Sequence, residues 1–376
     1  MAERTTSPSL AGRRELRRYS RHLLIPEIGL NGQERLTRAR VLCVGAGGLG
    51  SPVLQYLAAA GVGRIGVMDD DCVDETNLQR QTLFTMDDIG KNKALVAGER
   101  LRALNPQIYV DPIAVRLDDR NARELIRLYD VVVDCTDRFS TRYLINDACA
   151  LEKKPDVYAS IYRFDGQVSV FDASRGPCYR CVFPLPPPEG SVPTCAEGGV
   201  LGVLAGIVGT LQANEALKLL LGIGDPLVGR LLLIDALGAH VREISVGRDA
   251  SCALCGATPT IREAREAPSE IAAGGVAEID AAELDEALRD ALLLDVREPH
   301  EAVLGAFPGA VQIPVSQLEA RMHELDSSRR YVVACRIGQN SLWAVRRLHE
   351  AGFGRIAHLR GGLLAYAARD AEFVCF

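Results

Sequence analysis

Four cysteines occur in two pairs whose spacing suits a shared metal ion. The pairs are "CYRC" (Cys178, Cys181) and "CALC" (Cys252, Cys255). A C-x-x-C turn brings two sulfur atoms to one side of the chain, and two such turns supply the four ligands of a tetrahedral Zn²⁺ ion. Four thiolates leave no coordination position for water, so we predict a structural rather than a catalytic zinc. The alternative is two independent turns with free thiols.

Two further cysteines stand where a thiol could act as a nucleophile. Cys195 lies in "VPTCAEGG", a loop that we expect to precede a helix beginning at Gly198 or Gly199. Cys335 ends the strand-like run "RYVVAC" and is followed by a tight loop and a helix that we expect to begin near Ser341. Loop amides and a helix N-terminus stabilise a thiolate or a persulfide. A thiol in such a position is more nucleophilic, although Cys195 could also be a small half-buried residue.

Three glycines follow an apolar run in "VLCVGAGGLGSPVLQYL". Gly45, Gly47 and Gly50 have the spacing G-x-G-x-x-G, and a helical pattern follows them. A loop of this kind between a strand and a helix brings backbone N–H groups and the helix N-terminus against a phosphate. Asp69, at the end of the next strand-like run, is placed to bind ribose hydroxyls. The pattern alone does not distinguish NAD from ATP.

Polar and cationic side chains that follow this loop favour ATP. "DETNLQRQ" contains Asn77 and Arg80, and "GKNK" adds Lys91 and Lys93. An enzyme that splits a triphosphate must neutralise charge on the departing pyrophosphate, whereas a dehydrogenase keeps the pyrophosphate intact. Asp137 follows the strand-like run "DVVVDC", where a carboxylate could hold Mg²⁺. Each of these residues taken singly could equally be a solvated loop position.

The order of the elements predicts an α/β fold. From Arg38 onward, short apolar runs alternate with segments of helical periodicity, which is typical of a parallel sheet with crossover helices. The segment 157–172 has the alternation of an antiparallel hairpin, and we place its turn at Asp165–Gly166.

A change of composition divides the chain into two domains. Residues 257–275 are small and charged and show no strand pattern, so we expect them to form a linker. The first domain then spans residues 1–256 and contains the four paired cysteines. The second spans residues 276–376 and has the α/β alternation on a smaller scale. A chain of 376 residues is long enough for two such cores.

Bulk composition excludes several classes of protein. The formal net charge is −6 and the pI is near 5.7, so there is no basic surface of the kind that binds nucleic acid. The longest apolar stretch, residues 198–224, contains Gln212, Asn214, Glu215 and Lys218, so we expect a buried core helix and no membrane span. The polar N-terminal residues lack the apolar segment of a secretion signal, and the eleven cysteines then favour metal binding or thiol chemistry. We therefore expect a cytoplasmic protein.

The segment from Leu16 to Gly256 resembles a known enzyme family. The stretches that carry the resemblance are "RYSRHLLIPEIGLNGQERL", "GAGGLGSPVLQYLAAAGVG", "TNLQRQ", "GKNK" and "DCTD". They look like the adenylyltransferases that activate ubiquitin-like sulfur carrier proteins in the molybdopterin and thiamine pathways. The resemblance implies a Rossmann-like, ubiquitin-activating-type domain that binds ATP and the Gly-Gly terminus of the carrier. It further implies that an acyl-adenylate forms and pyrophosphate is released.

The same resemblance assigns roles to individual residues. The residues that match nucleotide-binding positions are Gly48 (ATP), Asp69 (ribose), Asn77, Arg80 and Lys93 (phosphates) and Asp137 (Mg²⁺). Arg21, in "RYSR", resembles an arginine that the family supplies from the partner subunit, which implies a homodimer. In this family a cysteine at the position of Cys195 attacks the adenylate or resolves a sulfur intermediate. The chain departs from the pattern at Arg138, where the family often has asparagine.

The second domain resembles a rhodanese, a smaller α/β sulfurtransferase fold. The resemblance rests on "LLLDVREPHE", "PGAVQIPV", "VVACRIGQNS" and "LRGGLLAY" and covers Val276 to Phe376. It implies that Cys335 carries sulfur as a persulfide, received from a persulfide or thiosulfate donor. Rhodanese loops commonly have arginine at the position of Asn340, and Arg336 could substitute for that anion contact. The alternative is an inert domain kept for docking.

These features together predict a fused enzyme. It would adenylate the C-terminal glycine of a sulfur carrier protein and then deliver sulfur from Cys335 to make a thiocarboxylate. Cys195 would help to release the product through either an acyl disulfide or a thioester. One alternative is an adenylyltransferase with a rhodanese domain used only for docking, and another is an NAD-binding oxidoreductase. No residue in the sequence selects one carrier or one pathway.

Overall fold

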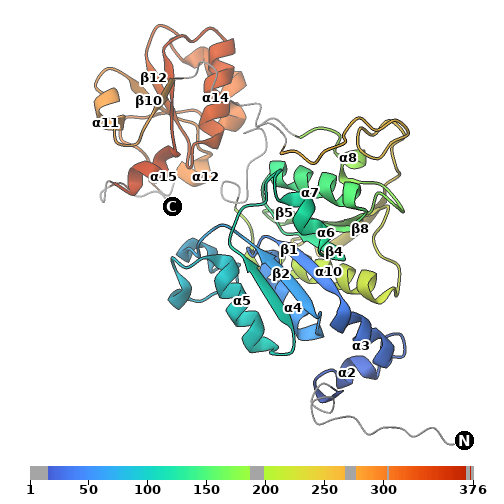
Figure 1. Cartoon of the computed structure of the whole chain (residues 1–376). Helices are drawn as coiled ribbons and strands as arrows, with labels where there is room; N and C mark the ends of the chain where they lie inside the picture. Colours follow the sequence, from blue (N-terminus) through green and yellow to red (C-terminus); the bar gives the residue numbers. More distant parts are fainter. Residues whose placement is uncertain (1–15, 187–198, 267–276, 303–304, 370–372, 374–376) are drawn as a thin grey trace, which may run out of the picture. The chain divides into compact units, whose positions relative to one another are not determined.

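The computed structural model describes residues 16–186, 199–266, 277–302, 305–369 and 373 (Figure 1). The chain divides into two compact units, and the division near the C-terminal third falls between Ala267 and Pro268. Among the described residues, no helix is both long enough and apolar enough to cross a lipid bilayer.

The larger unit is built on an eight-stranded sheet in the order β3-β2-β1-β4-β5-β6-β7-β8. Its strands are β1 (Arg40–Val44), β2 (Arg64–Met68), β3 (Tyr109–Ile113), β4 (Val131–Asp134), β5 (Asp156–Tyr162), β6 (Asp165–Phe171), β7 (Arg230–Asp235) and β8 (His240–Ser245). The strands from β3 to β5 pair in parallel and the rest are antiparallel. The predicted parallel sheet with crossover helices is confirmed.

Helices cover both faces of this sheet (Figure 1). The helical segments are α2 (Ser20–Leu23), α3 (Gly29–Arg38), α4 (Gly50–Ala60), η1 (Glu75–Asn77), η2 (Met86–Asp88), α5 (Lys93–Leu104), α6 (Ala122–Arg127), α7 (Phe139–Glu152), α8 (Tyr179–Val182) and α10 (Gly202–Leu221). Successive residues of a strand point to opposite faces. Val41 and Cys43 of β1 therefore pack in the core with α4, α5 and α10, while Leu42 and Val44 pack with α6 and α7.

The strand order reverses between β1 and β4, which are neighbours in the sheet but far apart in the sequence. The connections after β1 lead to β2 and β3 on one side of it in the sheet, and the connection after β4 leads to β5 on the other side. In open α/β sheets, ligands bind at the carboxyl ends of the strands at such a switch point. The loop after β1 carries the three glycines, and the loop after β4 carries Asp137.

The predicted hairpin is present, but its turn is not at Asp165–Gly166. Tyr162 pairs with Asp165, so the two turn residues are Arg163 and Phe164, and Arg163 adopts a positive φ of 51°. Gly166 already lies in β6. A β-carbon there would come within 2.5 Å of the Val208 side chain on α10. The glycine therefore serves close packing of the strand against the helix rather than the turn.

The helix expected at Gly198 or Gly199 begins later, at Gly202. Gly199 has a φ of 73°, and the backbone of Arg163 bonds to Gly199 on one side and to Leu201 on the other. This pairing forms an isolated β-bridge between Arg163 and Val200, just before the helix begins. Cys195 lies outside the described residues. The observed helix, α10, begins seven residues after it, so the expected helix start directly beside Cys195 is not seen.

Residues 257–266, which fall in the expected linker, pack against the larger unit. Ala264 is buried in the core with α6 and α7, and Arg116 forms an ion pair with Glu266. Burial of the Ala264 side chain and the Arg116–Glu266 ion pair hold this segment on the domain surface. Residues 267–275 lie outside the described part, so the predicted domain boundaries stay predictions.

The smaller unit contains a parallel sheet in the order β11-β10-β12-β13-β9. Its elements are β9 (Ala277–Ile279), α11 (Leu284–Ala287), β10 (Leu292–Asp295), α12 (Pro299–Ala302), β11 (Val311–Gln312), η3 (Val315–Gln317), α13 (Leu318–Arg321), η4 (Met322–Glu324), β12 (Tyr331–Ala334), α14 (Gln339–Glu350), β13 (Ile356–Leu359) and α15 (Gly362–Ala367). One core holds side chains of α14 and the other holds side chains of α15. The second α/β domain is confirmed.

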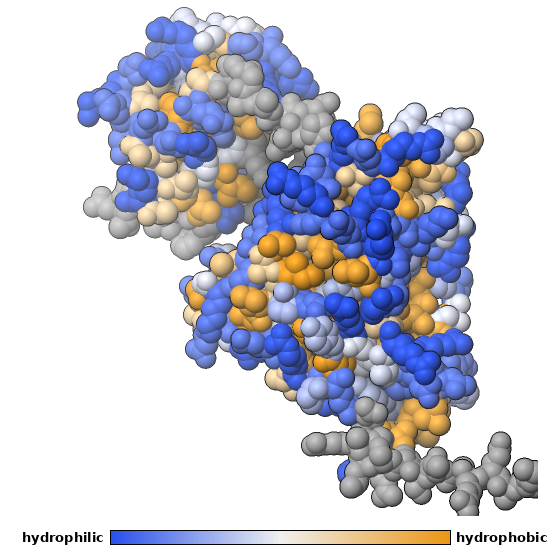
Figure 2. Space-filling view, viewed as in Figure 1, coloured by the Kyte–Doolittle hydropathy of each residue, from blue (hydrophilic) through white to orange (hydrophobic). Residues whose placement is uncertain are grey.

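Large apolar side chains are exposed near the N-terminal end of the larger unit. Leu24, at the end of α2, is 73% exposed, and Leu30 of α3 is 60% exposed. Figure 2 shows hydrophobic residues gathered at the end of the unit where α2 lies. Exposed apolar groups of this size are typical of surfaces that another molecule covers.

Candidate functional site

The glycine loop after β1 lies directly against the end of β4. Gly45 has a φ of 97°, and a β-carbon there would sit 2.7 Å from the backbone oxygen of Cys135. A β-carbon on Gly50 would overlap the backbone oxygen of Gly45. Only glycine fits at these two positions, and the loop leads straight into the N-terminus of α4. The geometry is that of a phosphate-binding loop.

Asp69 anchors this loop from the end of β2. One of its carboxylate oxygens accepts from the amide of Ala46 at 2.8 Å, and the other accepts from the amide of Asp71 at 2.9 Å. Burial raises the pKa of Asp69 above its ordinary value, although Lys93 and the two amides oppose this shift. The carboxylates of Asp69, Asp70 and Asp71 also lie within 4.8 Å of one another. Asp69 is thus held at the edge of the glycine loop, as its predicted ribose contact requires.

Lys93 is brought beside this carboxylate cluster by local pairing of two loops. The backbone of Lys93 bonds to Asp71, and the amide of Asn92 donates to the backbone oxygens of both Asp69 and Asp71. Asn92 also caps α5 by accepting from the amide of Leu95. Lys93 is therefore fixed as the first residue of α5.

The ammonium group of Lys93 is held by one carboxylate. Its Nζ lies 3.2 Å from Asp71, and the lysine side chain is only 7% exposed while Asp71 is 57% exposed. Lys93 is thus a buried cation paired with a half-exposed carboxylate. Lys91 lies instead 3.7 Å from Asp88 and is largely exposed.

Arg80 reaches the glycine loop from the segment after η1. A β-carbon added at Gly48 would lie 3.4 Å from Cγ of Arg80, so the arginine stem packs over Gly48. The guanidinium donates to the backbone oxygen of Thr76 at 3.1 Å. The amide of Asn77 lies 3.4 Å from the hydroxyl of Thr76. The structure therefore brings Arg80 to Gly48, and it places Asn77 on the same short segment.

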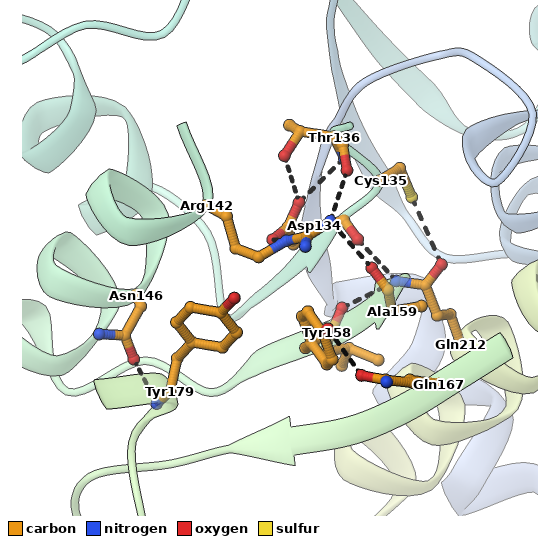
Figure 3. Close-up of polar contacts among 11 residues, drawn as sticks. Asp134, Cys135, Thr136, Arg142, Asn146, Tyr158, Ala159, Gln167, Tyr179 and Gln212 are labelled. Carbon is orange, nitrogen blue, oxygen red and sulfur yellow. Dashed lines mark hydrogen bonds and ion pairs between the residues drawn. The ribbon is translucent and has the colours of Figure 1, made fainter. Parts of the chain in front are cut away.

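A buried network holds the loop that carries Asp137 (Figure 3). The carboxylate of Asp134 accepts from the amide and the hydroxyl of Thr136, and Arg142 donates to the backbone oxygen of Thr136. Gln212, on α10, donates to the backbone oxygens of Asp134 and Val157. These bonds clamp the ends of β4 and β5 and leave Asp137 exposed beyond them.

The charges in this network do not balance. Arg142 is 4% exposed and pairs with Asp134 at 3.4 Å. Asp156 is 1% exposed, and neither of its carboxyl oxygens has a hydrogen-bond partner in the described structure. Burial raises the pKa of Asp156 well above its ordinary value, and Asp134 raises it further while Arg142 opposes them. Asp156 therefore favours its protonated, neutral form.

The four paired cysteines come together as their spacing predicts. Their sulfur atoms all lie within 4.8 Å of one another, and the shorter pairs range from 3.3 Å to 3.9 Å. Four sulfurs around one tetrahedral Zn²⁺ ion at a bond length of about 2.3 Å are about 3.8 Å apart. The donor set and the spacing both fit such an ion. The cluster joins the start of α8 to the chain segment after β8.

Cys335 directly follows β12 and begins the turn that leads into α14. The amide of Gly338 donates to the Cys335 sulfur at 3.1 Å, and α14 begins at the next residue. Gly362 closes the turn from behind, because a β-carbon there would lie 2.5 Å from the backbone oxygens of Cys335 and Arg336. Asn340 is buried. The predicted arrangement of cysteine, loop amide and helix start is therefore present.

Some predicted residues are not brought to a site in this structure. Arg21 is exposed on α2, and no described contact joins it to the glycine loop of its own chain. Cys195 lies outside the described residues. Asn92, Gln212 and Arg142 were not predicted as site residues. Asn92 carries the signal of a helix cap. The partners of Gln212 are remote in the sequence and left no local pattern. Arg142 lies within eight residues of Asp134 and Thr136, but that spacing matches no motif we used.

Comparison with known proteins gives two family matches. Residues 19–254 match the ThiF family, and residues 280–369 match the rhodanese-like domain. The first match covers the glycine loop, the Asp137 loop and three of the four paired cysteines. The second covers Cys335 and the helix that follows it.

Similar curated proteins match either about two thirds of the chain or nearly all of it. A sulfur carrier protein adenylyltransferase of Thermus thermophilus is 58% identical over 254 residues, which are 66% of this chain and 94% of that protein. The probable adenylyltransferase/sulfurtransferase MoeZ of Mycobacterium tuberculosis is 45% identical, covering 96% of this chain and 94% of its own. The adenylyltransferase and sulfurtransferase MOCS3 of Sus scrofa is 41% identical, covering 94% of this chain and 86% of its own.

Among solved structures, the larger unit is similar to E. coli MccB. A crystal structure of MccB with ATP matches with a TM-score of 0.56 at 25% identity, covering 64% of this chain and 74% of MccB. A second one, with MccA-N7isoASN, has a TM-score of 0.58 and covers 64% of this chain and 75% of MccB.

The raised pKa of the buried Asp156 carboxyl should make the stability of the larger unit depend on pH. A raised pKa in the folded state means that the unfolded chain loses the Asp156 proton first, so stability falls as pH rises from the ordinary value of 3.8 towards the folded pKa. The loss is about 1.4 kcal/mol for each pH unit in that window. We expect Asp156→Asn to gain stability over the wild type at about pH 8 and to gain much less at about pH 5.

Urea unfolding at both pH values measures this difference. Asp119→Asn, which changes an exposed carboxylate of the same unit, is the matched control. An Asp156→Asn variant whose stability relative to the wild type is the same at both pH values would contradict a buried neutral carboxyl.

Proposed function

This chain belongs to the ThiF family and carries a rhodanese-like domain, and we propose that it makes a thiocarboxylate in two linked steps. It is an adenylyltransferase and a sulfurtransferase. Its first step adenylates the C-terminal glycine of a ubiquitin-like sulfur carrier protein ending in Gly-Gly, and its second delivers sulfur from Cys335. The observation that carries this proposal is that MoeZ and MOCS3, which match nearly the whole chain, are named for both activities.

The adenylation step requires a leaving group and a place for its charge. A carboxylate oxygen of the carrier attacks the α-phosphorus of ATP, and the bond to the β-phosphate breaks, giving an acyl-adenylate and pyrophosphate. The glycine loop would hold the phosphates and Asp69 the ribose. Lys93, Arg80 and Asn77 would then stabilise the negative charge that develops on pyrophosphate. Crystallised MccB with bound ATP supports ATP as the nucleotide.

Asp137 is our proposed ligand for Mg²⁺. The residue is exposed at the switch point, and a carboxylate oxygen is the kind of ligand that this ion prefers. A bound Mg²⁺ would supply positive charge to the phosphates. The network of Asp134, Arg142 and Gln212 fixes the loop on which Asp137 stands.

A homodimer would complete the nucleotide site. Arg21 is exposed on α2, and the neighbouring Leu24 and Leu30 expose large apolar surface that a second subunit would cover. We propose that Arg21 reaches the ATP phosphates of the partner subunit. Its charge would add to that of Lys93 and Arg80.

The sulfur step begins with a persulfide on Cys335, formed from a persulfide or thiosulfate donor. The outer sulfur attacks the acyl carbon, a C–S bond forms, and AMP leaves with the electron pair of the broken bond. A thiolate, which we assign to Cys195, then cleaves the S–S bond and releases the thiocarboxylate, leaving a disulfide that a cellular thiol must reduce. In the thioester alternative, Cys195 first takes the acyl group and AMP leaves. The persulfide then attacks the thioester, which frees the Cys195 thiolate and gives the same acyl disulfide. A thiolate must again cleave its S–S bond to release the thiocarboxylate.

We propose that the four-cysteine cluster binds a structural Zn²⁺. All four positions of a tetrahedral ion would be filled by Cys178, Cys181, Cys252 and Cys255, so the ion would supply stability and no catalysis. The cysteines are free thiols in the described structure, and thiols persist in a reducing compartment. We accordingly place the enzyme in the cytoplasm.

An adenylyltransferase with a rhodanese domain used only for docking is the second candidate. It would keep the larger unit as described, but it leaves the Gly338 contact to the Cys335 sulfur without a role. An NAD-binding oxidoreductase would use the glycine loop but would have no need of Lys93 beside it.

Loss of Lys93 should slow adenylation. We expect Lys93→Ala to reduce the rate of pyrophosphate release by about 100-fold, because one charge on the leaving group is no longer neutralised. Pyrophosphate is measured with ATP and a carrier ending in Gly-Gly. Lys91→Ala, two residues away and paired with Asp88, is the matched control and should retain activity. Full activity of Lys93→Ala would remove Lys93 from the phosphate site.

Loss of the Cys335 sulfur should separate the two steps. We expect Cys335→Ala to release pyrophosphate at the wild-type rate but to form no thiocarboxylate from a persulfide donor. Sulfide added directly should restore the product. Cys72→Ala, which removes an exposed cysteine, serves as the control. Wild-type thiocarboxylate formation by Cys335→Ala would favour the docking alternative.

Loss of the metal should destabilise the larger unit. We expect Cys255→Ser to lose bound zinc, measured by elemental analysis, and to unfold at a lower temperature than the wild type. Cys149→Ala, which changes a buried cysteine outside the cluster, should keep its zinc. Wild-type protein that contains no metal and does not respond to a chelator would contradict this assignment.

A further inference from the structure

A chain of hydrogen bonds runs from β13 to the Cys335 sulfur. The Ser341 hydroxyl, in the first turn of α14, donates to the backbone oxygen of Gly338 at 3.1 Å. The same hydroxyl oxygen lies 3.1 Å from Nδ1 of His358 on β13. On its other side Gly338 donates its amide to the Cys335 sulfur, also at 3.1 Å. Gly338 is thus held at its carbonyl by one group and touches sulfur with its amide.

These groups are buried and closely fitted. Ser341 is 0% exposed and His358 is 5% exposed. Gly338 has a φ of 98°, and a β-carbon on it would lie 3.3 Å from Cε1 of His358. The imidazole therefore supports the turn by contact as well as by hydrogen bonding. A movement of the His358 ring would therefore move the turn at Gly338.

The hydrogen bonds fix the form of the imidazole. Because Ser341 gives its proton to Gly338, its oxygen must accept the proton of His358 Nδ1. Burial lowers the pKa of His358, and the facing charges, Glu278 on the paired strand β9 and Arg360, act in opposite directions. A His358 proton on Nδ1 is the form that satisfies both hydrogen bonds of Ser341. The direction of the chain is His358 to Ser341 to Gly338.

We propose that Ser341 and His358 are positioning residues that hold the Gly338 amide on the Cys335 sulfur, and so stabilise the thiolate that accepts and carries sulfur. The inference rests on the proposed persulfide role of Cys335. An amide fixed in place before the reaction stabilises a developing negative charge without the cost of reorienting the loop. Neither residue touches the reacting sulfur.

The test uses the full chain and two pairs of variants. Ser341→Ala removes the hydroxyl and Ser341→Thr keeps it. His358→Phe removes the ring donor, whereas His358→Asn keeps a donor at the position of Nδ1. Each protein is also made with Cys335→Ala, so that the difference in ultraviolet thiolate absorbance follows Cys335 alone. Tyr331→Phe, which removes the hydroxyl contact to Asp326 in the same unit, controls for a general loss of stability.

We expect the apparent pKa of Cys335 to rise by about one unit in Ser341→Ala and in His358→Phe, since a hydrogen bond to a charged group is weakened. Thiocarboxylate formation at neutral pH should fall by about tenfold in both, with pyrophosphate release unchanged. Ser341→Thr, His358→Asn and Tyr331→Phe should behave like the wild type in both measurements.

An unchanged Cys335 pKa in Ser341→Ala and His358→Phe would overturn the inference, whatever happens to the transfer rate. A pKa raised equally in Tyr331→Phe would overturn it too, because the effect would then reflect loss of stability. Wild-type sulfur transfer by the single variant Cys335→Ala would instead overturn the proposed function. The absorbance measurement would still decide the positioning role in that case.

Discussion

The close contact between the loop after β1 and the end of β4 sets the geometry of the larger unit. Gly45 reaches within van der Waals distance of Cys135 only because it has no side chain and adopts a φ of 97°. This contact puts the N-terminus of α4 and the Asp137 loop on the same edge of the sheet. Asp69 reaches that edge from β2 on the other side, through its bond to Ala46. The nucleotide site that we propose depends on these neighbours.

Buried polar side chains then hold the strand ends and the Asp137 loop at this edge of the sheet. Gln212, buried on α10, ties β4 to β5, while Arg142 ties the Asp137 loop to α7. The cost of this network is visible at Asp156, which is buried without a hydrogen-bond partner in the described structure. The smaller unit uses the same principle, since Ser341 and His358 hold the turn on which Cys335 depends.

Local patterns in the sequence predicted the parts of the structure that local geometry determines. The glycine spacing predicted the loop after β1, and the C-x-x-C pairs predicted the four-sulfur cluster, because each pair or loop is short. Predictions failed where a remote partner decides the conformation. Gly166 packs against α10 instead of forming a turn, and pairing with Arg163 delays the start of α10 to Gly202. The roles of Gln212 and His358 likewise depend on hydrogen-bond partners that no sequence pattern predicts.

The central claim is that one chain passes sulfur from Cys335 to an adenylated carrier. Mass spectrometry of a single turnover tests it, with isotopically labelled sulfur loaded on Cys335 before ATP and a Gly-Gly carrier are added. We predict that the label leaves the Cys335 peptide and appears on the carrier in place of one oxygen, and only when ATP is present. A label that stays on Cys335 while ATP is split, or a carrier that gains no sulfur, would contradict the claim.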